Sequence, residues 1–119
     1  MAEGETILTK MQDLLLYMLP QIGKFPRDQK YLLGDRIIVK LLEVQENLLR
    51  AYYGKQKLNF LYEANLTLEI IRHLVRLSFA SKLFGTDRYE VMSRKLDELG
   101  RMVGAWIKQQ NLPRGNTGK

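Results

Sequence analysis

The sequence predicts an all-α protein, built as an antiparallel four-helix bundle. Three breaks, at residues 22–26, 52–57 and 84–87, divide the chain into four segments in which apolar residues recur at helical spacing. No stretch of useful length alternates between apolar and polar residues, as a half-buried strand would. Because short connections between long helices make consecutive helices antiparallel neighbours, we expect one bundle domain over residues 1–110. A flexible basic tail over residues 111–119 should follow it.

The composition fits a single intracellular domain. Hydrophobic residues make up 45% of the 119 residues, and a domain of this size buries roughly two thirds of the surface that its unfolded chain exposes. The chain has no cysteine, which excludes disulfides, thiolate metal sites and cysteine nucleophiles. Its amino terminus, MAEGETIL, is acidic, and its longest apolar run, LLLYML at 14–19, is far too short to span a bilayer. We expect a cytoplasmic protein without membrane contact.

Prolines mark the end of the first segment and the start of the second. Pro20 falls late in the first segment, where it should kink or end that helix. Pro26 suits the first turn of the second helix, and Asp28 then places a carboxylate near the exposed amides of that turn. From Leu33 the apolar residues follow helical spacing. The stretch FPRDQKYLLGDRI (25–37) therefore opens a helix, whether or not its cations also belong to a binding surface.

The second and third helices carry more apolar surface than one bundle face requires. One stripe on each predicts the core: Ile37, Leu41, Val44 and Leu48, then Leu61, Ala64, Leu68, Ile71 and Val75. A second stripe lies beside each: Ile38, Leu42 and Leu49, then Leu66, Ile70, Leu74 and Leu77. A helix in such a bundle normally keeps about half of its circumference for solvent. The second stripes therefore favour self-association over deep burial within one protomer.

The fourth helix has the cleanest pattern. Its apolar residues alternate three and four apart, as the seam of a bundle helix does. The seam consists of Tyr89, Met92, Leu96, Leu99, Val103 and Trp106. Asp87 and Glu90 have the spacing of a capping box, with Thr86 as the rival N-cap. Gly100 and Gly104 would let a neighbouring backbone come close, either inside the protomer or from another subunit.

The net charge favours polyanionic partners without identifying one. Nineteen Lys and Arg outnumber thirteen Asp and Glu, for a formal charge of +6. Arg72 and Arg76 share one stripe of the third helix, and residues 70–86 contain no acid. Further cations on polar stripes are Arg36, Lys40 and Arg50 in the second helix and Arg94, Arg101 and Lys108 in the fourth. The alternative is that these cations lie on ordinary solvated helix faces, where some of them form ion pairs, such as Arg72 with Glu69.

The sequence offers little for catalysis. The only histidine, His73, lies four residues after Glu69, a spacing that suits a hydrogen bond on the helix surface better than an acid/base couple. There is no paired Glu-x-x-His motif for a di-iron site, no Walker loop and no GxSxG elbow. We therefore predict no enzymatic activity, no metal and no cofactor. Any contact with nucleic acid would depend on charge and shape.

Three patches together resemble one family. KFPRDQKYLLGDRI (24–37), LYEANLTLEIIRHLVRLS (61–78) and ELGRMVGAWIK (98–108) are similar to the accessory variability determinant (Avd) proteins of diversity-generating retroelements. These proteins lie within a wider family of small four-helix bundles that includes those encoded in intervening sequences of bacterial ribosomal RNA genes. The similarity runs from about Leu14 to Lys108 and depends on the order of the patches, not on one diagnostic motif.

The resemblance implies a basic homopentamer, arranged as a ring of four-helix protomers. It would associate with the retroelement's reverse transcriptase and help it to make mutagenised cDNA from a template RNA. The basic surface would contact the enzyme, or RNA and/or DNA, or both. The alternative is a stand-alone bundle protein of the wider family that binds another RNA or protein. Binding to a membrane surface ranks last, because the cations are spread over three helices.

Several residues match the family by position. Arg72 and Arg76 match its paired arginines on the third helix, and the further candidate cations are Arg27, Arg36, Lys40 and Arg101. Gly100, Arg101, Gly104 and Trp106 match its last-helix pattern, in which Gly104-Ala105 here replaces a more usual pair of glycines. The second apolar stripes would become contacts between subunits or helices, through Leu66, Ile70, Leu74, Ile38 and Leu42. Residues alone support an oligomer, and only the resemblance supports five subunits.

Overall fold

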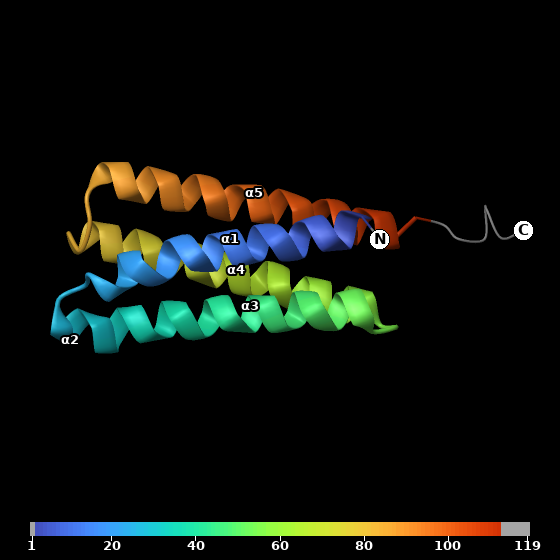
Figure 1. Cartoon of the computed structure of the whole chain (residues 1–119), viewed down its shortest axis with the longest axis horizontal. Coiled ribbons are helices and arrows are strands. Elements are labelled where there is room, and N and C mark those ends of the chain that lie inside the picture. Colours follow the sequence, from blue (N-terminus) through green and yellow to red (C-terminus); the bar gives the residue numbers. More distant parts are fainter. Residues whose placement is uncertain (1, 113–119) are drawn as a thin grey trace, which may run out of the picture.

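Four long helices make up most of the described part of the chain. The computed structural model describes the backbone of residues 2–112 and the side chains of residues 6–112. The long helices are α1 (Ala2–Gly23), α3 (Asp35–Tyr53), α4 (Lys57–Ala80) and α5 (Thr86–Gln110), and two short elements, α2 (Arg27–Gln29) and the π-helical turn η1 (Lys30–Gly34), connect α1 to α3. Consecutive long helices run in opposite directions (Figure 1). The described part of the chain is helical without strands, so the predicted all-α class is confirmed.

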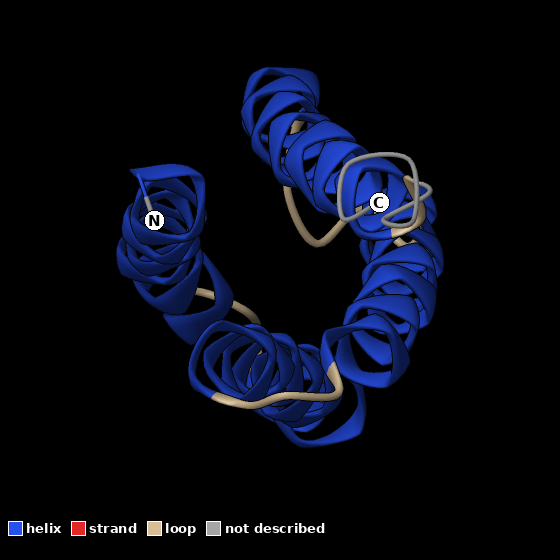
Figure 2. Ribbon diagram, turned by 90° about the vertical axis from the view of Figure 1, so that its right-hand side faces the viewer, coloured by secondary structure: helices blue, strands red, loops and turns tan. Residues whose placement is uncertain are grey.

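Each long helix packs against two others around one core. α1 contacts α3 and α5, and α4 contacts the same two helices; Figure 2 views the helices along the long axis of the bundle. The predicted core stripes of α3 and α4 are all buried, as are Met92 to Trp106 of the α5 seam. Only Tyr89, the first residue of that seam, is half-buried. α1 contributes Ile7, Met11, Leu14, Leu15, Met18 and Ile22.

The first helix does not end at Pro20. It continues to Gly23, and Pro20 lies exposed on its outer side. A proline removes one backbone donor, but here only one turn of helix follows it. That turn carries Ile22 into the core, and Phe25 follows just beyond it, with exposures of 0% and 3%. Their burial outweighs the missing hydrogen bond, so Pro20 does not end the helix; a kink at Pro20, the other predicted outcome, stays a prediction.

The segment 25–37 opens a helix, as predicted, but it is not a uniform one. Pro26 is the N-cap and Asp28 lies in the first turn. The chain then widens into η1, where Gly34 is buried. A Cβ atom on Gly34 would lie 2.9 Å from Cγ2 of Ile22, so the glycine lets this backbone approach α1. The neighbouring Tyr31, on the outer side, stays 66% exposed.

The start of α5 is not a capping box. Its N-cap is Gly85, with extended backbone and no side-chain cap. Thr86 is already helical, so Asp87 lies two positions after the N-cap and does not form a capping box with Glu90. Asp87 instead places a carboxylate in the first turn, where the positive end of the helix dipole favours it. The end of α5 is held at Asn111, whose side-chain amide donates to the Tyr62 hydroxyl over 3.2 Å.

The predicted tail begins directly after the last turn of α5. Asn111 and Leu112 still donate backbone hydrogen bonds to the last turn of α5, to Ile107, Lys108 and Gln109. Residues 113–119 lie outside the described residues. The prediction that residues 111–119 are a flexible basic tail therefore stays a prediction.

Candidate functional site

The outer side of the α4/α5 pair carries a groove made of two adjoining hollows. They share Tyr89, Ser93 and Asp97 of α5. The first, of about 210 Å³, is also lined by Arg72 and Arg76 of α4. The second, of about 450 Å³, is completed by Glu90, Arg94 and Arg101 of α5. We call these two hollows the α4/α5 groove.

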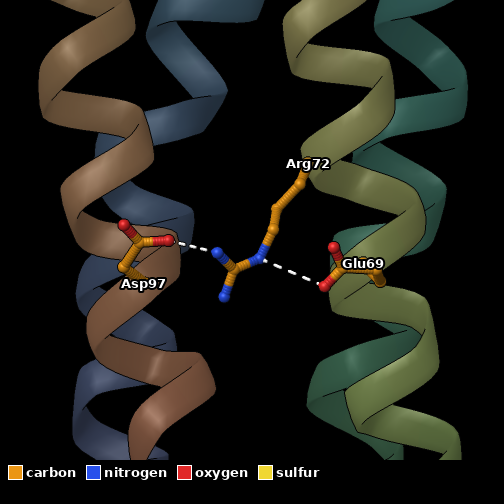
Figure 3. Close-up of polar contacts among 3 residues, drawn as sticks. All are labelled: Glu69, Arg72 and Asp97. Carbon is orange, nitrogen blue, oxygen red and sulfur yellow. Dashed lines mark hydrogen bonds and ion pairs between the residues drawn. The ribbon is translucent and has the colours of Figure 1, made fainter.

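Arg72 ties the two helices together at the floor of this groove (Figure 3). Its Nη1 donates to Oδ1 of Asp97 on α5, and its Nε lies 3.6 Å from Oε1 of Glu69, one turn earlier on α4. The side chain is 34% exposed, and its Nε is buried without a hydrogen bond. Arg72 is therefore an engaged cation. The acid-free stretch around it suggested few partners, but its main partner, Asp97, comes from the neighbouring helix α5.

Gly100 makes room for this guanidinium. A Cβ atom on Gly100 would lie 2.5 Å from Nη2 of Arg72. The close approach that a glycine permits thus occurs inside the protomer, between a side chain of α4 and the backbone of α5. Gly104 differs, because it is exposed and an added Cβ would have no atom within 4 Å.

The other arginines of the groove are unengaged. Arg76, Arg94 and Arg101 are exposed and form no ion pair or hydrogen bond with any side chain between residues 6 and 112. Arg94 and Arg101 stand seven residues apart on α5, and Lys108 continues that row by the same interval. Of the carboxylates lining the groove, Asp97 is held by Arg72, which leaves Glu90. The groove is therefore electropositive, with cations from both helices.

The remaining candidate cations lie elsewhere. Arg36 and Lys40 belong to α3, where Lys40 pairs with Glu43 over 3.3 Å. Arg27 starts α2, and both Arg27 and Arg36 are exposed without an ion pair in the described part. The structure thus brings Arg72, Arg76 and Arg101 together and leaves these three apart from them.

Of the residues that line the groove, the sequence predicts only Arg72, Arg76 and Arg101 as site residues, and it misses Tyr89, Arg94 and Asp97 among others. Tyr89 starts the apolar seam of α5, a position for which the sequence predicts a core residue. Asp97 and Arg94 lie on the polar side of the same helix, where the row Arg94, Asp97, Arg101 has the spacing of one outer stripe. This stripe could have indicated Arg94 and Asp97 from the sequence, but only the packing of α4 against α5 shows which side chains of α4 they meet.

His73 does not pair with Glu69. The imidazole is exposed, and Glu69 is engaged by Arg72 instead. Among residues 6–112, no group of three or more His, Asp and Glu side chains gathers closely enough to hold a metal ion. None of the described helices combines the length and the apolar character that a membrane crossing requires.

The second apolar stripes divide into covered and uncovered residues. Ile38 and Leu74 are half-buried and pack against the core, and Trp106 is a core residue that is 3% exposed. Leu42 and Leu66 are 42% and 58% exposed. Trp106 is therefore buried inside the protomer, whereas Leu42 and Leu66 remain exposed.

Most of the uncovered aliphatic residues of the long helices fall on two faces. The α1/α3 apolar face consists of Leu16, Leu19, Val39, Leu42 and Leu49. The row on α1 and the row on α3 are adjacent, because Leu8 and Gln12 of α1 line the same hollow as Gln45 and Leu49 of α3. Since the two helices are antiparallel, Leu16 and Leu42 both lie about one turn along the bundle from this hollow, on the same side of it. The α4 apolar face consists of Leu66, Ile70 and Leu77, of which Ile70 is half-buried.

A polar stripe of α3 separates these two faces. Its members are Arg36, Lys40, Glu43, Asn47 and Arg50, three or four residues apart. The Arg50 guanidinium lies 5.9 Å from the centre of the Phe60 ring of α4, which places this stripe along the boundary between α3 and α4. The protomer thus presents two separate apolar faces, one on each side of that boundary.

Comparison with known proteins identifies the family. No curated protein and no solved structure gives a significant match. A family model described as bAvd-like matches residues 6–110, a range that contains the whole α4/α5 groove. The match covers most of the chain and agrees with the resemblance to Avd proteins, so this chain belongs to the bAvd-like family.

Proposed function

We propose that this protein is a non-catalytic accessory protein of a diversity-generating retroelement. It binds the retroelement's reverse transcriptase and/or its template RNA through the α4/α5 groove, and so supports mutagenic cDNA synthesis. Membership of the bAvd-like family supports the retroelement context. The observation that carries the choice of surface is the set of three unengaged arginines, Arg76, Arg94 and Arg101, around one groove.

Arginine suits this role for a physical reason. Its planar guanidinium presents five donors in a fork that matches phosphate and carboxylate oxygens. A cation that already has a partner must give up that partner before it can bind another anion, whereas Arg76, Arg94 and Arg101 give up only water. Arg72 has the complementary role, because it holds Asp97 and so reduces the repulsion that this carboxylate exerts on an approaching polyanion.

The protein also self-associates in this proposal, as a ring. In a closed ring each subunit uses two different surfaces, one toward each neighbour. The α1/α3 and α4 apolar faces are two such surfaces on one protomer. Five subunits are what the family resemblance implies. A ring repeats the α4/α5 groove on every protomer, so that modest contacts add through multivalency.

The binding surface is tested by charge reversal. The Arg76→Glu/Arg94→Glu variant should keep its melting temperature, because neither side chain has a partner to lose, yet capture the reverse transcriptase or template RNA at least about tenfold more weakly. Capture is measured by titration with each purified partner at fixed salt.

A matched control separates the groove from net charge alone. Arg27→Glu/Arg36→Glu makes the same change with two exposed, unpaired arginines on α2 and α3. This control should bind almost as well as the parent protein. Equal losses in both variants would show that total charge governs binding and would reject the groove assignment.

A further inference from the structure

Tyr89 places an aromatic ring at the edge of the basic groove. Its ring stacks on that of Phe79, with centroids 4.2 Å apart and 6° between the planes, and the Phe84 centroid lies 6.4 Å away. These contacts fix the ring from the core side. Tyr89 is nevertheless only half-buried, and it borders both hollows of the α4/α5 groove. The groove therefore combines a rigid aromatic ring with unengaged arginines.

The cations lie on both sides of this ring. Arg76 reaches the first hollow from α4, and Arg94 lies five residues after Tyr89 in the second. Arg101 extends the row by about 10 Å along the axis of α5, since each residue of a helix rises about 1.5 Å. A positively charged groove that follows a backbone, with an aromatic ring for bases to stack on, is how many proteins hold single strands.

The lining chemistry disfavours a protein partner at this place. Protein interfaces depend on buried apolar anchors at their centre. The aliphatic residues of the groove, Val75 and Leu96, are 1% exposed and belong to the core. A duplex would also leave Tyr89 unused, because its base faces are covered by stacking, whereas an unpaired base offers its face.

We infer that the α4/α5 groove binds single-stranded nucleic acid, with one base stacked at Tyr89 and phosphates held by Arg76, Arg94 and Arg101. This inference deepens the proposed function and rests on it. It gives the ring of Tyr89 a binding role in addition to its place in the seam, and it identifies the unpaired parts of an RNA or DNA as the ligand of this surface.

The test compares two probes that differ only in their bases: a labelled oligouridylate and an abasic phosphodiester strand of equal length. The parent protein should bind the oligouridylate roughly 5- to 100-fold more tightly, which is the usual effect of stacking one base. Tyr89→Leu keeps an apolar contact with Phe79 but removes the aromatic face, so this preference should disappear. Tyr89→Phe should keep it. Because both probes titrate the same folded fraction, the ratio is insensitive to lost stability.

Arg76→Gln gives the complementary readout. It should leave the preference for bases intact and lower the slope of log affinity against log salt by about 0.7, the value for one phosphate on a single strand. A parent protein that binds both strands equally, or a duplex more tightly than the oligouridylate, would overturn the inference while leaving electrostatic RNA binding in place. An Arg76→Gln variant with an unchanged salt slope would instead contradict the groove itself.

Discussion

The Arg72→Glu variant is expected to unfold more easily than the parent protein, with its free energy of unfolding lowered by about 1–3 kcal/mol. The change removes the contacts with Asp97 and Glu69 and brings a third carboxylate next to these two. Arg72 and Asp97 are 34% and 48% exposed, so the loss should lie between that of a surface pair and that of a buried one. Thermal or urea unfolding measures it.

A charge swap shows whether the contact itself is responsible. Arg72→Glu combined with Asp97→Arg restores one opposite-charge pair between α4 and α5, and should recover part of the lost stability. Arg76→Glu is the matched single control on α4, since Arg76 has no ion pair in the described part and should change stability little. If Arg72→Glu melted at the parent temperature, or if the swap recovered nothing, Arg72 would not be tying the helices together.

The core could be predicted from the sequence because it depends on local periodicity. The interval of three and four residues that places Met92, Leu96 and Leu99 on one side of α5 is a property of any α-helix. The Arg72–Asp97 contact could not be predicted in the same way, since the two residues are 25 apart and meet only in one register of α4 against α5. A slide of one turn would place Ser93 or Arg101 opposite Arg72 instead.

Local rules failed where tertiary burial opposed them. The rule for proline is sound, yet α1 continues past Pro20 because Ile22 occupies the core. The π-helical turn likewise reflects the approach of Gly34 to Ile22, which no spacing in the segment 25–37 specifies. The residues of the candidate site also depend in part on tertiary packing. The polar stripe of the fourth helix already points to Arg101, whereas the position of Tyr89 at the groove depends on how α4 packs against α5.

Aspartate on either apolar face is expected to stop self-association without unfolding the protomer. Leu16→Asp/Leu42→Asp changes the α1/α3 face, and Leu66→Asp/Leu77→Asp changes the α4 face; their exposures are 70%, 42%, 58% and 51%. Since roughly half of each of these side chains is still exposed, burying the rest of two of them in an interface contributes about 1.5–3 kcal/mol, or roughly one to two orders of magnitude in dissociation constant. Light scattering should find both variants monomeric at concentrations where the parent is oligomeric.

Gln56→Asp/Asn59→Asp is the control, because it adds the same charge at two exposed polar positions and should leave the oligomer intact.

Mixing the two variants distinguishes a ring from a symmetric dimer. In a ring, the α1/α3 face of one protomer contacts the α4 face of the next, so each variant keeps one functional face that its own copies cannot use. The equimolar mixture should therefore form a heterodimer and stop there, since the two faces left over are both blocked. A symmetric dimer would use one face twice, and then one of the two variants would still pair with itself. A mixture that stays monomeric, or a variant that assembles alone as the parent does, contradicts the ring.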